Sequence, residues 1–262
     1  MNAVREAAVA GLFYPDDPAR LRRAVTCMLR QDRTPAPPWH PRALIVPHAG
    51  YVYSGEVAAR AYRLLAPVRD RIHRVALLGP AHRMRLEGMA LPTASAFETP
   101  LGRVPLDRAG IARIADQPAV VNADEAHRFE HALEVQLPFL QVVLGPFTVA
   151  PLVVGDCPPQ RVAAVVDVLA EDPDTLFVLS SDLSHFLDYD QARETDQRTR
   201  DKILAHSTSL TGREACGARV INGFMCSRTA AGLTVELLDL RNSGDTAGER
   251  DRVVGYASFV LH

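Results

Sequence analysis

The order of apolar and polar positions along the chain predicts strands and helices in alternation. Short apolar runs typical of buried strands occupy 43–46, 74–82, 147–156, 175–182 and 251–261. Helical patterns occupy 17–30, 54–67, 106–116, 132–144, 159–171, 189–206 and 218–240. We therefore expect one α/β domain over 1–262, with a central, largely parallel or mixed sheet and helices on both faces.

Turn-forming residues refine this expectation at two places. Residues 88–107 predict extended chain on either side of a turn at 99–102. Within 132–144, Pro138 should kink the helix or begin a new turn, because proline cannot donate a backbone hydrogen bond inside a helix.

Composition narrows the class of protein. The chain has 262 residues, of which 47% are hydrophobic and 23% charged, and its net charge is −2. This ordinary globular balance shows no basic patch for nucleic acid or a membrane surface. No apolar stretch approaches the ~18 residues that a membrane span requires, and the N-terminus lacks the features of a signal peptide. We expect a cytoplasmic protein without a nucleic-acid or membrane partner.

The four cysteines do not form a disulfide framework in a chain of this length, which favours a reducing compartment. Cys27 and Cys226 lie within helical patterns and are expected in the core, and Cys157 is expected in a loop. Cys216 differs, because the next helix is expected to begin at about Ala218. A helix N-terminus stabilises a thiolate, which suits a metal ligand or a nucleophile.

Three of the predicted strands run into a histidine. His48 follows the strand at 43–46, His82 follows the apolar run that begins at 74, and His185 follows the strand that begins at 175. In open α/β sheets, ligand sites form beyond the carboxyl ends of the strands. If these strands are parallel neighbours, the three imidazoles meet in one pocket, although each histidine taken singly also fits a polar turn residue.

Several imidazoles in one pocket indicate a metal site. Neutral imidazole binds Zn, Fe, Cu and Ni, and two histidines with one anionic ligand leave coordination positions open. The candidates for the anionic partner are Asp182, Glu130, Glu134, Asp156 and Cys216.

The segment 127–139 adds four polar side chains at helical spacing. His127, Glu130, His131 and Glu134 are three or four residues apart, so one helix face could carry several of them. The segment lacks the HExxH pattern of zinc proteases. Glu130 and His131 fit a role against the substrate or behind the metal ligands, and a solvated helix start explains them almost as well.

Asp182 lies three residues before His185 in a short polar turn. Its carboxylate could accept a ring N–H from a ligand histidine and fix the tautomer of that ring. A helix N-cap at Asp182 explains the residue equally well.

Eight motifs along the chain carry a family resemblance. They are AGLFYPDDPARL, VPHAGYVYSG, LGPAHR, ETPLGRVPLD, EHALEVQLPF, SSDLSHF, ACGARVINGFM and GYASFVLH. Together they resemble the Memo (mediator of cell motility) family, whose prokaryotic members are called AmmeMemoRadiSam system protein B. The family is similar in fold to class III extradiol dioxygenases, which are non-haem iron enzymes.

The resemblance implies a metal pocket built by His48, His82 and Cys216, with His185 in the same cleft. The dioxygenases use a carboxylate where this sequence offers Cys216, a softer ligand that also suits Cu(I) or Zn. Iron(II) is the expected metal, with copper or zinc as alternatives. The catalytic candidates are His185 as acid or base, Asp182 and His131.

Two functions follow from the resemblance. The first is a non-haem metalloenzyme of the dioxygenase-like oxidoreductase class, acting on an unidentified small molecule or peptide. The second is a non-catalytic, metal-binding or redox-responsive adaptor that recognises a partner protein or peptide. The family name also implies association with an AMMECR-type protein and a radical-SAM protein.

Overall fold

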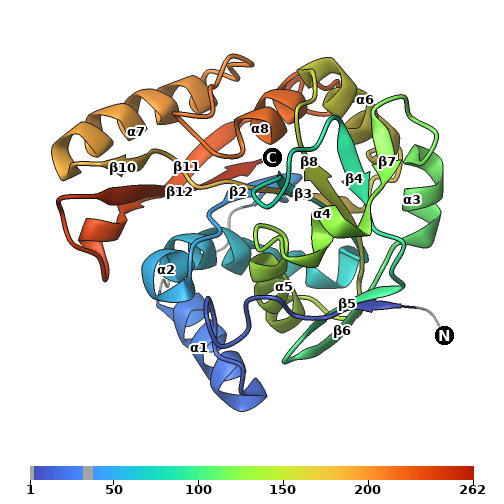
Figure 1. The fold of residues 1–262 in the computed structure, drawn as a ribbon, viewed down its shortest axis with the longest axis horizontal. Helices are drawn as coiled ribbons and strands as arrows, with labels where there is room; N and C mark the ends of the chain where they lie inside the picture. The colour runs from blue at the N-terminus through green and yellow to red at the C-terminus, as the bar shows by residue number, and fades with distance from the viewer. Residues whose placement is uncertain (1–2, 32–37) are drawn as a thin grey trace.

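The structure, a computed structural model, describes residues 3–31 and 38–262, and Figure 1 shows its ribbon. Its described part contains a nine-stranded mixed sheet in the order β10-β12-β2-β9-β3-β8-β4-β7, with β11 paired to β12. These strands are β2 (Ala43–Val46), β3 (Arg74–Pro80), β4 (Met89–Leu91), β7 (Val120–Asn122), β8 (Thr148–Val154), β9 (Thr175–Ser180), β10 (His185–Leu187), β11 (Val235–Asn242) and β12 (Val253–Leu261). The predicted single α/β domain with a mixed sheet is confirmed.

The strands that precede the three predicted site histidines are parallel neighbours. β9 pairs in parallel with β2 on one side and with β3 on the other, and β8 continues the parallel set beyond β3. Nearly every side chain in these four strands is buried, which explains their continuous apolar runs. Their carboxyl ends therefore open onto the same edge of the sheet.

Helices cover both faces of this sheet. In Figure 1, α1, α2 and α5 lie on one side of the strands, and α6, α7 and α8 lie on the other. The helices are α1 (Pro18–Arg30), α2 (Tyr51–Tyr62), α3 (Arg108–Ile114), α4 (Asp124–Arg128), α5 (Leu137–Val143), α6 (Pro159–Leu169), α7 (Tyr189–Leu204) and α8 (Ala218–Met225). Side-chain caps fix the starts of several of them; Asp17, for example, accepts the backbone N–H of Arg20 at 2.7 Å.

A second, three-stranded sheet has the order β1-β5-β6, from Val4–Arg5, Ala96–Thr99 and Gly102–Pro105. Its β5–β6 hairpin confirms the turn predicted at 99–102. Three 3₁₀ segments complete the described secondary structure, at Arg63–Arg71, Glu134–Gln136 and Ser243–Asp245. Pro138 lies in the first turn of α5, so it begins a new helix, as one of its two predicted roles requires.

The long apolar helix predicted over 218–240 is wrong. α8 ends at Met225, and the chain returns as β11, which adds antiparallel to the β12 edge. The apolar residues of 235–242 fit a helical pattern as well as a strand pattern. Pairing with β12 decides for the strand, because it supplies hydrogen-bond partners for the backbone of this segment.

The prediction that Cys27 and Cys226 lie in the core is also wrong. Cys226 caps the end of α8 and is exposed, and Cys27 is exposed on α1. Cys157 lies in a loop as predicted, although its side chain is buried. In the described ranges, no helix combines the length and hydropathy needed to cross a bilayer.

Candidate metal centre

His48 is held rigidly at the end of β2. Its side chain is 2% exposed, its backbone N–H donates to Asp182 Oδ1 at 2.7 Å, and its Nδ1 lies 2.8 Å from Ser180 Oγ. The Ser180 hydroxyl donates its one hydrogen to the carbonyl oxygen of Ala132 at 2.6 Å. Its oxygen accepts a hydrogen bond from Gln136 Nε2 at 2.8 Å. Ser180 Oγ therefore accepts the N–H of His48 Nδ1, which leaves the lone pair on His48 Nε2.

His82 is oriented by a buried carboxylate. Glu130 is 1% exposed and accepts both the backbone N–H of His82 at 2.6 Å and His82 Nδ1 at 2.9 Å. These hydrogen bonds, with a third from the Ala132 N–H, outweigh burial and lower the pKa of Glu130 to about 2. An ionised carboxylate only accepts, so His82 carries its proton on Nδ1 and its lone pair on Nε2.

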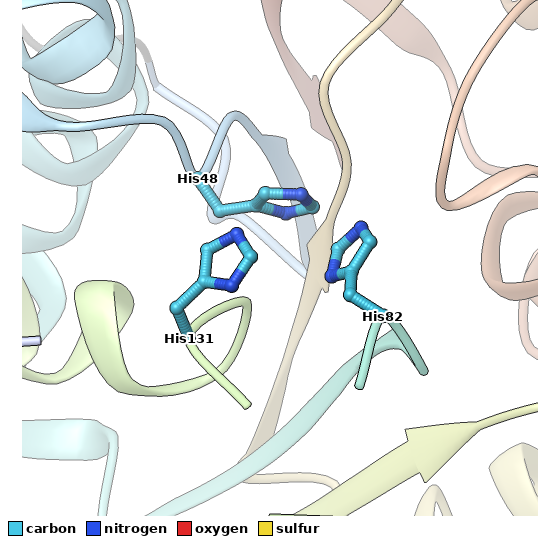
Figure 2. Close-up of side chains that lie close together, drawn as sticks. All are labelled: His48, His82 and His131. Carbon is cyan, nitrogen blue, oxygen red and sulfur yellow. The ribbon is translucent and has the colours of Figure 1, made fainter. Parts of the chain in front are cut away.

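His131 completes a group of three imidazoles. One ligand atom from each of His48, His82 and His131 can be chosen so that all three lie within 4.8 Å of one another. Figure 2 shows the three rings gathered from three separate chain segments. The His82 and His131 rings stack with centroids 4.8 Å apart, and His48 meets both edge-on.

The environment keeps the imidazoles of His48 and His131 neutral. Burial, and next the His82 ring, lower the pKa of His48 well below its usual range. Burial, and next the His48 ring, lower the pKa of His131 to about 4. The Nδ1 atom of His131 is buried and makes no hydrogen bond within the described residues. Neutral imidazole is the form of histidine that binds a metal ion, and His48 and His131 are held in that form.

Cys216 lies beside this group. Its Sγ is 3.3 Å from His48 Nε2 and accepts the backbone N–H of Asp182 at 3.2 Å. Burial, followed by the Asp182 carboxylate, raises the pKa of the thiol to about 12, opposite to the effect expected from the start of α8. A bound metal ion would reverse that direction, since a coordinating thiol is deprotonated.

A glycine permits the close approach of Cys216 to the β9 end. A Cβ on Gly217 would lie 2.6 Å from Ser181 Cβ and 2.7 Å from the carbonyl oxygen of Ser180. The Gly217 N–H instead donates to Ser181 Oγ at 2.9 Å. Only glycine leaves room for this contact.

Asp182 is buried between Cys216 and His48, but neither predicted role describes it. The residue lies in a loop after β9, so it caps no helix. Its Oδ1 accepts a backbone N–H of His48, whereas its Oδ2 is 3.9 Å from His48 Nε2, too far for a hydrogen bond. Asp182 therefore positions His48 through the main chain, and the tautomer of that ring is set by Ser180.

His185 is half-buried at the start of β10 and lies outside the three-histidine group. Its Nδ1 donates to the carbonyl of Leu183 at 2.9 Å, which leaves the lone pair on Nε2. His185 is close enough to contribute to the lowered pKa of His48. Its role as acid or base stays a prediction.

The single helix face expected over 127–139 is not formed. α4 ends at Arg128, and the chain turns before the 3₁₀ segment at Glu134–Gln136, so these polar residues diverge. Glu130 and His131 enter the pocket. The Glu134 carboxylate instead accepts hydrogen bonds from the side chains of Arg5 and Tyr14 and from the backbone N–H groups of residues 8 and 9. These bonds anchor the N-terminal segment.

The other two polar candidates also lie apart from the imidazoles. His127 is buried and its Nε2 donates to the carbonyl of Ala90 at 2.9 Å. Asp156 is exposed and pairs with Arg219 at 2.9 Å. Ser180 and Gln136 are site residues that the sequence patterns did not indicate, although Ser180 stands within the SSDLSHF motif.

Comparison with known proteins decides the family. A family model described as Memo-like protein matches residues 5–260. A MEMO1 family protein of Methanopyrus kandleri is 34% identical over 285 residues, covering 98% of this chain and 98% of that protein. MEMO1 family proteins of Aquifex aeolicus and Archaeoglobus fulgidus are 34% and 33% identical, over 98% of this chain and 99% of each relative. This chain belongs to the Memo family.

The donor set of this Memo-family chain fits a transition metal. The lone pairs of His48 and His82 are both on Nε2, and the buried Nδ1 of His131 has no hydrogen-bond partner in the described structure. That Nδ1 atom lies 3.4 Å from Glu130 Oε1 without a hydrogen bond to it, and a ligand that orders the His131 ring would offset the cost of the unmade hydrogen bond. Imidazoles with one thiol nearby suit Fe, Cu or Zn rather than Mg or Ca.

Proposed function

We propose that this Memo-family protein binds a redox-active transition metal, iron(II) first, and acts as a non-haem oxidoreductase. The observation that carries the proposal is the group of three imidazoles, two of them oriented by hydrogen bonds at Nδ1. His48 and His82 supply two ligands. The third comes from His131, which completes the imidazole group, or from Cys216, whose Sγ is 3.3 Å from His48 Nε2.

A bound iron(II) would supply Lewis acidity and one-electron chemistry at open coordination positions. The chain itself supplies orientation and proton transfer. Ser180 and Glu130 keep the two ligand rings in their metal-binding tautomers. His185, with its lone pair on Nε2, is placed to take up or give a proton at that atom.

Anaerobic reconstitution tests the proposal. Purified protein is stripped of metal, loaded with Fe(II), Cu(I) or Zn(II) without oxygen, and then followed by oxygen uptake. Uptake that rises in proportion to bound iron supports the oxidoreductase. Stoichiometric metal binding without uptake for any organic substrate tried favours the adaptor, and failure to bind any of these metals refutes the proposal.

Matched variants identify the third ligand. Cys216→Ser and His131→Asn remove one donor each while nearly conserving volume. A cobalt(II) substitution carries a sulfur-to-metal charge-transfer band only if Cys216 is a ligand. Loss of that band together with weakened affinity in Cys216→Ser assigns the thiolate. If the parent shows no such band and His131→Asn weakens its metal affinity, the third ligand is the His131 imidazole.

One observation favours the adaptor as a second candidate. Three large apolar side chains, Met84, Phe129 and Phe186, are 38%, 59% and 63% exposed and lie within two residues of site histidines. Exposed apolar groups around a pocket suit contact with a partner protein or peptide. Association with AMMECR-type and radical-SAM proteins stays a prediction of the family resemblance, and a place in the cytoplasm stays a prediction from composition and cysteine content.

A further inference from the structure

A cleft of about 330 Å³ opens beside the candidate metal centre. Three segments line it: the chain at the end of β3 and just after it, between Pro80 and Leu86, the residues 154–156 at the end of β8, and the residues 216–220 at the start of α8. Ala81 in the first segment immediately precedes His82. Cys216 is the residue that the cleft shares with the metal pocket, since it lines the cleft and its Sγ lies 3.3 Å from His48 Nε2.

The charged groups that line the cleft are two arginines and one carboxylate. Arg219 pairs with Asp156 at 2.9 Å, whereas Arg85 makes no hydrogen bond, ion pair or ring contact with the described part of the chain. These three groups leave one net positive charge in the cleft. A guanidinium offers paired N–H donors that match the two oxygens of a carboxylate.

Apolar groups complete the lining. They include Met84, Val220, Leu86 and Ala81. The exposed lining is more polar than apolar, which suits a small charged molecule with a short apolar body rather than a mainly apolar ligand. Its volume excludes a large ligand, and its single net charge matches a monoanion better than a dianion.

We propose that this cleft binds the carboxylate of a small organic acid, with Arg85 as the principal anion contact and Arg219 as its partner. This inference names the substrate class of the proposed metalloenzyme, and so its catalytic meaning rests on that function, although the binding itself does not. The carboxylate lies on Arg85, the apolar body packs on Met84 and Val220, and the far end points past Cys216 toward the imidazoles.

Calorimetric titration of the full chain, metal-free and Fe(II)-loaded, tests the inference. The probes are benzoate, its uncharged analogue benzamide, and inorganic phosphate. The variants are Arg85→Gln and, as the matched control, Arg83→Gln, since Arg83 is bonded to the carbonyl of Phe129 and does not line the cleft. We expect benzoate to bind the parent, and Arg85→Gln to weaken that binding about five- to tenfold, because a charge-assisted hydrogen bond is lost from a partly exposed group.

The controls fix what each outcome means. Arg83→Gln should bind benzoate like the parent, and benzamide and phosphate should bind more weakly than benzoate. Equal benzoate affinity in Arg85→Gln and the parent, equal affinity for benzamide, tighter binding of phosphate, or no benzoate binding would each overturn the inference. Arg85-dependent binding to metal-free protein that takes up no iron would leave the cleft assigned and refute the proposed function instead.

Discussion

Removal of the Ser180 hydroxyl should show how much the tautomer of His48 contributes to metal affinity, because it leaves every metal-ligand atom in place. Ser180 Oγ makes three hydrogen bonds, to His48 Nδ1, Gln136 Nε2 and the Ala132 carbonyl, and the side chain is fully buried. Ser180→Ala removes all three without touching a ligand atom. The His48 proton then has no acceptor at Nδ1, so the ring is free to carry it on Nε2, the atom that faces the metal pocket.

The structure sets the expected magnitude. The buried N–H of His48 loses its acceptor, which costs about 1–3 kcal/mol, while Gln136 keeps the Pro47 carbonyl at 2.9 Å and loses less. We expect the free energy of unfolding to fall by about 2–4 kcal/mol. Partners behind a ligand histidine change metal affinity by roughly 10–100-fold, and the same factor is expected here.

The assay joins two measurements. Nitrogen-15 NMR of the metal-free protein reports which nitrogen of His48 carries the proton, and chelator competition gives the metal affinity. Ser258→Ala is the matched control, because Ser258 is equally buried and its Oγ has no hydrogen-bond partner in the described residues. It should leave both readouts at the parent values.

An unchanged His48 tautomer with parental metal affinity in Ser180→Ala would refute the reasoning. A loss of stability alone would show that the Ser180 network supports only the fold.

Three further outcomes are expected. Burial lowers the pKa of His127 to about 4, so this imidazole stays neutral in the folded protein but takes up a proton below about pH 6.5 in the unfolded chain; His127 alone should therefore lower the free energy of unfolding by about 3 kcal/mol as pH drops from about 6.5 to 4, in addition to the losses due to His48 and His131. His127→Gln should remove that loss in urea melts at pH 7 and pH 4.5, and an unchanged pH dependence would contradict it. In Gly217→Ala the new Cβ would lie 2.7 Å from a β9 carbonyl oxygen, so the variant should lose about 1–3 kcal/mol of unfolding free energy in a thermal melt and bind metal more weakly. Gly145→Ala, with open space around it, should change neither stability nor metal binding. Cys216→Ser should weaken Cu(I) or Zn binding in a metal titration, and the exposed Cys226→Ser should leave binding and stability alone; equal affinity in both would count against a thiolate ligand.

Local patterns predicted the α/β class, the parallel strands and the arrival of His48 and His82 at one edge of the sheet. These features follow from short-range rules: a fully apolar run of four to seven residues forms a buried strand, and a histidine just past it lies at the strand's carboxyl end. The same rules failed where two structures suited one pattern. The apolar residues of β11 matched a helix by spacing, and only the unpaired β12 edge decided for a strand.

The ligand environment was decided by tertiary structure. Glu130 and His131 were candidates on a continuous helix, but they reach the imidazoles because the chain breaks after α4, which no residue spacing indicated. The sequence by itself determined the four parallel strands at the centre of the sheet and the positions of His48 and His82 just past two of them. The tautomers of His48 and His82 depend on hydrogen bonds to Ser180 and Glu130, 132 and 48 residues away along the chain, and such contacts exist only once the fold has closed.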